Sequence, residues 1–141
     1  MSKHFSAAAA CLSLLFVATG ALAGDPAAGE SVFKKCKACH AIVAPDGAEI
    51  QKGGSVGPNL YGVIGRAVGS DPAYLPKYGP STLAAGALGL VWDEAMLAAY
   101  LADPSAWLKT MTGDAAARSK MAFRLAEGGE DVAAYLASVA Q

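Results

Sequence analysis

The chain has 141 residues, of which 54% are hydrophobic and 16% are charged, and its formal net charge is −1. This length is enough for one domain of ordinary size and too short for two. The balanced charge argues against a nucleic-acid-binding protein, because such domains carry a marked excess of Lys and Arg.

The first 23 residues have the organisation of a secretory signal peptide. A polar start with Lys3 precedes an apolar stretch from Phe5 to about Val17, and the segment ends in Ala21-Leu22-Ala23, an A-x-A cleavage pattern. The apolar stretch is shorter than the roughly 20 residues that a spanning helix needs, so a retained membrane anchor is the weaker interpretation. We therefore expect residues 1–23 to be cleaved and residues 24–141 to form a single exported domain.

The mature chain begins with a predicted helix that runs into a cysteine motif. Asp25 suits a helix cap and Pro26 suits a first helical turn, while Val32, Phe33 and Cys36 follow at helical spacing. Removal of Lys3 leaves ten Lys and Arg against twelve Asp and Glu, a formal charge of −2.

The middle of the chain is predicted to be mostly loop. Glycine and proline recur through residues 41–68, in PDG, KGG and GPNLYG, and again in GSDPAYLPKYGPS. Short helices are expected at most near Leu60 to Ile64 and near Ser81 to Gly86. No strand period or internal repeat is visible in this region.

Three helices are predicted in the C-terminal part. One runs from Trp92 and stops before Pro104, and a second lies around Ala106 to Thr110. The last has an apolar stripe made of Val132, Tyr135, Leu136 and Val139. The result is an all-α protein with unusually long loops. Such loops normally need something to order them, and a large apolar cofactor would do so.

The segment KKCKACH, residues 34–40, indicates which cofactor this is. Cys36, Cys39 and His40 form C-x-x-C-H, the attachment sequence of c-type haem. One helical turn sets both thiols at the porphyrin edge, and the adjacent imidazole reaches the iron from one face. Export favours this interpretation, because haem is attached outside the cytoplasm. Cys11 leaves with the signal peptide, so both remaining cysteines are used.

Other uses of these residues stay open at this point. A zinc site needs four ligands, but the mature chain offers only Cys36, Cys39 and His40 besides acidic side chains that form no motif. A thioredoxin-like dithiol requires a βαβ context, which is missing. A structural disulfide between the two cysteines is a further alternative.

A haem iron bound by His40 on one face can take a second axial ligand on the other, and a methionine thioether is the natural choice because His40 is the only mature histidine. Met96 lies on the apolar stripe of a predicted helix and is interpreted as core packing. Met111 in KTMTGD and Met121 in SKMAF are the two remaining candidates.

The ordered set of motifs resembles a bacterial class I cytochrome c of the cytochrome c2 type. C-x-x-C-H is followed by GPNLYGVIGR, then WDE, then KMAF, and finally AAYL in the last helix. The resemblance spans Gly24 to Gln141. It implies the class I cytochrome c fold, with few helices and long loops wrapped around one covalently bound haem c, in a monomer without a membrane anchor in the periplasm.

The resemblance also implies roles for individual residues. It makes Met121 the axial ligand opposite His40. Met111 is the alternative ligand, because the stretch before Met121 contains residues that shorter family members lack. Pro58 matches a proline whose carbonyl accepts the ring N–H of the ligating histidine. Three residues match donors to the haem propionates: Arg66, Tyr78 and Trp92.

The function implied is one-electron transfer and not enzyme catalysis, because His/Met ligation leaves no open position on the iron. By resemblance, the partners are a cytochrome bc complex and a photosynthetic reaction centre or terminal oxidase. A haem enzyme or gas sensor with a displaceable methionine is the competing hypothesis. Six basic residues are candidates for a face that docks acidic partners: Lys34, Lys35, Lys37, Lys109, Lys120 and Arg124.

Overall fold

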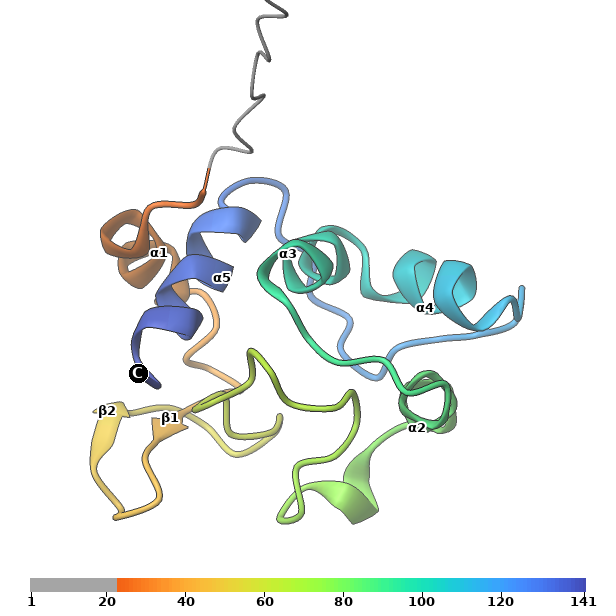
Figure 1. The fold of residues 1–141 in the computed structure, drawn as a ribbon, viewed down its shortest axis with the longest axis horizontal. Coiled ribbons are helices and arrows are strands. Elements are labelled where there is room, and N and C mark those ends of the chain that lie inside the picture. The colour runs from red at the N-terminus through yellow and green to blue at the C-terminus, as the bar shows by residue number, and fades with distance from the viewer. Residues whose placement is uncertain (1–22) are drawn as a thin grey trace, which may run out of the picture.

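Helices form most of the regular structure in residues 23–141, the part of the chain that this computed structural model describes (Figure 1). In these residues the α-helices are α1 (Pro26–Phe33), α2 (Pro80–Ala87), α3 (Glu94–Ala102), α4 (Pro104–Thr112) and α5 (Gly129–Ser138). A 3-10 helix, η1, spans Leu75–Lys77, and the strands β1 (Ile42–Val43) and β2 (Glu49–Gln51) pair antiparallel. Apart from Ala23, the predicted signal peptide lies outside the described residues.

Aspartate caps explain where three helices begin. The side chain of Asp25 accepts from the backbone N–H of Ala27 at the start of α1. Asp93 accepts from the backbone N–H of Met96 at the start of α3, and Asp103 accepts from that of Ala106 at the start of α4. Each cap satisfies an N–H that has no partner inside the helix. The predicted helices in these regions are therefore confirmed.

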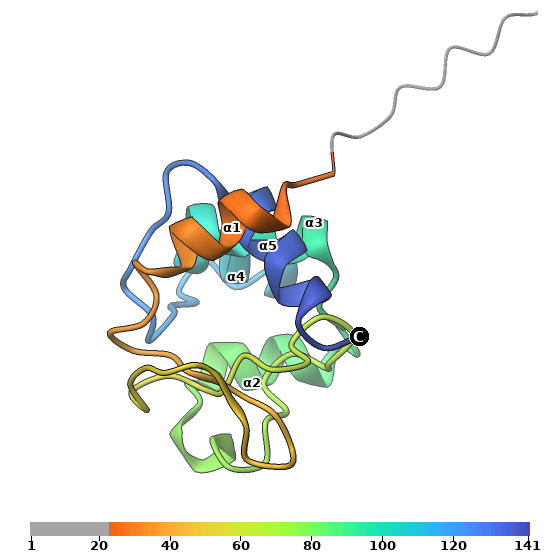
Figure 2. The ribbon, with the colours of Figure 1, turned by 90° about the vertical axis from the view of Figure 1, so that its left-hand side faces the viewer.

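The first and last helices cross at close range. A Cβ built on Gly29 of α1 would lie 1.9 Å from the carbonyl oxygen of Asp131 in α5, so only glycine allows this approach. Beside the crossing, the rings of Phe33 and Tyr135 lie 5.8 Å apart. Figure 2 shows α1 and α5 together with α3 and α4 on one side, and α2 with the loops on the other.

Several sequence-based expectations need correction. Helix α1 ends at Phe33, before the cysteine motif, and residues near Leu60 to Ile64 form turns instead of a helix. Helix α4 is longer than predicted, because Pro104 fits its first turn and Gly113, with φ of 70°, ends it. The strands β1 and β2 were not predicted, since two and three residues are too few for a visible alternation.

The loop before α2 is tied to the segment that leads into α3. The backbone N–H of Trp92 donates to the carbonyl of Arg66 at 2.9 Å, and that of Gly65 donates to the carbonyl of Trp92 at 2.7 Å. These two bonds hold the backbone of Gly65 and Arg66 beside that of Trp92. Between residues 23 and 141, no helix is both long and apolar enough to cross a bilayer.

Candidate functional site

The cysteine motif lies on a tight turn that directly follows α1. The backbone N–H groups of Cys39 and His40 both donate to the carbonyl of Cys36, at 3.1 and 3.0 Å. Both thiols are free, with Cys36 buried and Cys39 exposed. Burial raises the pKa of the Cys36 thiol, which keeps it protonated. The turn therefore presents two reduced thiols and an imidazole from one short segment.

The ring of His40 is fixed in one tautomer. Its Nδ1 lies 2.8 Å from the carbonyl oxygen of Pro58. Because a carbonyl oxygen can only accept, Nδ1 carries the proton, and the lone pair of Nε2 is free for a metal. Burial lowers the pKa of His40, and the hydrogen bond to Pro58 offsets this only in part. The imidazole is thus held in the neutral form that binds iron.

The segment that carries Pro58 is pinned to the motif by backbone hydrogen bonds. The N–H of Gly54 donates to Lys37 and that of Gly57 donates to Cys39, at 2.9 and 2.8 Å. A Cβ on Gly57 would lie 2.2 Å from Cε1 of His40. The backbone can therefore pass directly beside the imidazole only because residue 57 has no side chain.

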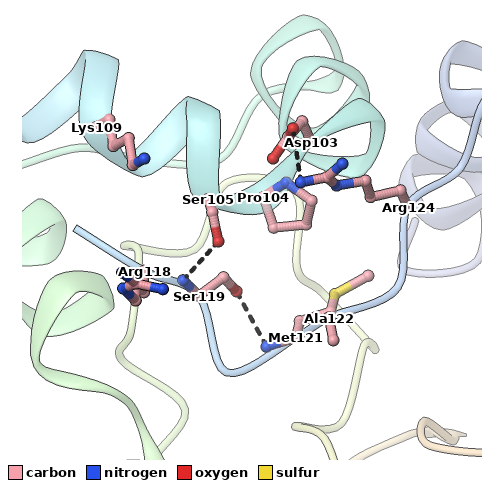
Figure 3. Close-up of a pocket in the computed structure, with 9 residues that line it drawn as sticks. All are labelled: Asp103, Pro104, Ser105, Lys109, Arg118, Ser119, Met121, Ala122 and Arg124. Atoms are coloured by element: carbon pink, nitrogen blue, oxygen red, sulfur yellow. Dashed lines mark hydrogen bonds and ion pairs between the residues drawn. The ribbon is translucent and has the colours of Figure 1, made fainter. Parts of the chain in front are cut away.

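Met121 lies half-buried on the loop between α4 and α5, in contact with the core. Its backbone N–H donates to Oγ of Ser119 at 3.0 Å. The same oxygen lies 2.9 Å from the hydroxyl of Tyr100, and the N–H of Ser119 donates to Oγ of Ser105 at 3.1 Å. This network ties the Met121 loop to α3 through Tyr100 and to α4 through Ser105. Figure 3 shows the bond to Ser105 and the bond between Ser119 and Met121.

A cavity of about 380 Å³ opens beside Met121 and is rich in basic side chains. Figure 3 shows Arg124 paired there with Asp103, with 3.1 Å between Nη2 and Oδ2. The other basic residues that line the cavity are Lys109 and Arg118. Positive charge thus gathers next to the candidate axial methionine, although residues 24–141 carry more acidic than basic side chains.

The other two methionines in residues 23–141 occupy helices. Met96 lies in α3 and Met111 lies in the last turn of α4, and both are half-buried against the core. Met111 was expected outside the helices, and the greater length of α4 explains the difference. A loop methionine can be aimed at a cofactor without disturbing helix packing, and of the three only Met121 lies on a loop.

The three candidate propionate donors have distinct surroundings. Arg66 donates from Nη2 to the carbonyl of Asn59 at 2.8 Å. Trp92 is buried, with its ring stacked on Trp107 at 5.0 Å and edge-on to Tyr100 at 5.1 Å. Tyr78 is packed edge-on against Tyr74, and burial raises the pKa of its phenol.

Sequence reasoning missed three polar residues in this region: Asp71, Tyr100 and Ser119. None of these three residues is singled out by the sequence alone. The hydrogen bonds between Asp71 and Asn59 and between Tyr100 and Ser119 span 12 and 19 residues of the chain. A local motif carries no signal for contacts of this range, although the proline after Asp71 does indicate a turn.

The residues that surround the motif fit a covalently attached haem. Two free thiols, a neutral imidazole with an available Nε2, and a half-buried thioether are the donor set that c-type haem requires. The disulfide alternative is wrong, because Cys36 and Cys39 are unpaired. Among the described residues, no group of three His, Cys, Asp or Glu side chains lies together as a zinc site would need.

Comparisons with known proteins place this site in context. Cytochrome c2 from Rhodobacter capsulatus is 54% identical over 134 residues, covering 95% of this chain and 96% of that protein. Cytochrome c-550 from Paracoccus pantotrophus is 51% identical over 116 residues, covering 81% of this chain and 85% of its own length. No protein-family profile matches the chain.

Solved structures agree with these relatives. The structure of cytochrome c2 from Rhodobacter capsulatus superposes with a TM-score of 0.81 at 56% identity, covering 84% of this chain and 100% of that one. Ferric cytochrome c-550 from Paracoccus versutus superposes with a TM-score of 0.80 at 48% identity, covering 84% of this chain and 99% of that one.

Proposed function

The chain belongs to the cytochrome c2 family of class I cytochromes c, and from this membership we propose that it shuttles single electrons between membrane redox complexes in the periplasm. Its donor is proposed to be a cytochrome bc complex and its acceptor a photosynthetic reaction centre or terminal oxidase. We further propose that residues 1–23 are a cleaved signal peptide and that residues 24–141 form a soluble, monomeric domain.

Like its relatives, the protein is an electron carrier with one covalently attached haem c, and it is not an enzyme. When bound, the haem iron supplies the one-electron chemistry. In our proposal, Cys36 and Cys39 hold the group covalently, and His40 and Met121 bind the iron from opposite faces. Arg66, Tyr78 and Trp92 are proposed to meet the propionates.

The observation that carries the ligand assignment is the 2.8 Å hydrogen bond between Nδ1 of His40 and the carbonyl of Pro58. It orients the imidazole and increases its donor strength. A thioether from Met121 would favour the reduced iron and, together with the imidazole of His40, would leave no coordination position open to a substrate. A filled coordination sphere suits a carrier, because little has to rearrange when one electron moves.

The ligand assignment is tested by absorption spectroscopy of the purified protein, oxidised and reduced. We expect a near-infrared charge-transfer band from methionine sulfur to ferric iron in the wild type. Met121→Ala should abolish this band, whereas the matched variant Met111→Ala should retain it, because Met111 packs in α4. The mass of the same sample should equal residues 24–141 plus one haem.

Other outcomes would contradict separate parts of the proposal. Loss of the band in Met111→Ala but not in Met121→Ala would reverse the ligand assignment. A haem-bearing wild type with no such band would mean that the iron lacks a methionine ligand. A mass without haem would overturn the proposal as a whole.

A further inference from the structure

Asp71 stands apart from the other charged residues of this protein. Among residues 23–141, it is the only charged side chain that is buried, with 6% of its surface exposed. Burying a carboxylate is costly unless hydrogen bonds compensate for the lost water. The contacts of Asp71 should therefore show what this charge is for.

Both carboxylate oxygens of Asp71 accept hydrogen bonds from the backbone. Oδ1 accepts from the N–H of Ala73 at 3.0 Å, which closes a turn around Pro72. Oδ2 accepts from the N–H of Asn59 at 3.2 Å. The first bond is local to the turn, but the second reaches 12 residues back along the chain, to the segment beside His40.

The N–H of Asn59 and the carbonyl of Pro58 belong to the same peptide unit. That carbonyl oxygen accepts the Nδ1 proton of His40 at 2.8 Å. A continuous chain of two hydrogen bonds therefore runs from the imidazole of His40, through the amide between residues 58 and 59, to Oδ2 of Asp71. The buried charge thus lies at the end of a relay that begins at the candidate iron ligand.

We propose that Asp71 is a positioning residue that lowers the reduction potential of the bound haem by acting on His40 through the 58–59 peptide. The inference rests on the proposed function, since it takes His40 as an axial ligand. A negative charge at the N–H end polarises the amide toward its oxygen, and linked hydrogen bonds strengthen one another in this way. The carbonyl then accepts more strongly from Nδ1, and His40 becomes a stronger donor, which favours ferric iron.

The neighbouring guanidinium of Arg66 forms an ion pair with Asp71 that offsets part of this charge, but it does not displace the hydrogen bond from Asn59 to Oδ2. Nη1 of Arg66 lies 4.0 Å from Oδ2 of Asp71, beyond hydrogen-bond distance, while its Nη2 donates to the carbonyl of Asn59 at 2.8 Å. Asp71, Tyr74 and Lys77 also line a cavity of about 240 Å³ together with Pro58 and Asn59. Pro58, Asn59 and Asp71, which form the last part of the relay, therefore lie at the wall of this cavity.

The test measures the midpoint potential of the haem-loaded protein. Asp71→Asn removes the charge but keeps an oxygen for the N–H of Ala73, so the turn is preserved. We expect its midpoint potential to lie about 28 mV above that of the wild type. This shift corresponds to a roughly threefold change in the equilibrium constant of reduction, at about 59 mV per decade for one electron. The NMR resonance of the His40 Nδ1 proton should also shift toward that of a weaker hydrogen bond.

Asp46→Asn is the matched control. Asp46 also closes a turn, with Oδ1 accepting from the N–H of Ala48 at 3.0 Å, but it is exposed and has no link to Pro58. We expect its potential to stay at the wild-type value. Asp71→Glu keeps the negative charge, so its midpoint potential should lie between those of Asp71→Asn and the wild type.

Three outcomes would overturn the inference. In the first, Asp71→Asn is less stable but its potential is unchanged, so the role is structural. In the second, both Asn variants shift the potential equally, so any lost charge has the same effect. In the third, the His40 proton resonance is unmoved. If Asp71→Asn yields no holoprotein, Asp71→Ser is measured by the same criteria. A wild type without haem would instead overturn the proposed function.

Discussion

At the scale of single residues, the site depends on a glycine that leaves room for an imidazole. In Gly57→Ala, the new Cβ would lie 2.2 Å from Cε1 and 2.6 Å from Nδ1 of His40, far inside contact distance. The ring must then turn away from Pro58, which breaks the bond that orients it. We expect destabilisation of about 1–3 kcal/mol, the usual range for an overpacked site, together with a changed reduction potential.

Thermal unfolding and potentiometry of the holoprotein measure both effects. Ser55→Ala is the control, because Ser55 is exposed on the same segment and already carries a Cβ. Wild-type stability and potential in Gly57→Ala would show that the backbone can shift to accept the methyl group.

Residues of the site differ in how far the sequence could predict them. Cys36, Cys39 and His40 form a contiguous motif whose chemistry follows from residue type and spacing alone. Pro58 was predicted only through resemblance, although the bond that its carbonyl accepts is present. Ser119 and Asp71 act through partners that folding brings close, so their roles became visible only in the structure.

At the scale of elements, the crossing of α1 and α5 has no room for a side chain at Gly29. In Gly29→Ala, the new Cβ would lie 1.9 Å from the carbonyl oxygen of Asp131 and 2.8 Å from Cβ of Tyr135. Alanine gains about 1 kcal/mol in helix propensity over glycine. The clash outweighs this gain, because backbone atoms of α5 cannot move without moving the helix. We expect net destabilisation of about 2 kcal/mol.

Chemical denaturation of the holoprotein measures this difference in the free energy of unfolding. Ser31→Ala is the matched control, since Ser31 is exposed on the same helix. This replacement should stabilise the protein by at most about 0.5 kcal/mol, through the higher helix propensity of alanine. A Gly29→Ala protein as stable as the wild type would mean that the two helices can separate without loss.

Elements were predictable where apolar spacing and capping residues agreed. Both α3 and α5 have apolar residues at helical spacing. In addition, α3 begins with an aspartate cap and α5 has acidic residues in its first turn. By contrast, β1 and β2 pair across a turn with only two and three residues each, and their register is irregular. Strands this short are defined by long-range hydrogen bonds and leave no periodic trace in the sequence.

At the scale of the whole molecule, charge is distributed unevenly. Residues 24–141 have a formal net charge of −2, yet Lys109, Arg118 and Arg124 line the cavity beside Met121. Lys120 is exposed in the same loop. A local basic face on an acidic protein attracts an acidic partner at short range and orients it on approach.

This distribution predicts how electron transfer to a partner membrane complex should depend on salt. Charges at a docking face act over roughly 10 Å at 0.1 M ionic strength, and added salt shortens that distance. The second-order rate with an acidic partner should therefore fall as ionic strength rises. Lys109→Glu should lower the rate about tenfold at low salt and approach the wild-type rate at high salt, because steering changes encounter rates by tens to hundreds of times.

The matched control is Lys52→Glu, which makes the same charge change at an exposed residue that does not line the cavity. Since both variants have the same net charge, their difference isolates the position of the charge from its amount. Equal rate losses would show that only the net charge matters, and a salt-independent wild-type rate would exclude electrostatic docking altogether. A larger loss for Lys109→Glu would place the electron-exchange surface next to the Met121 loop.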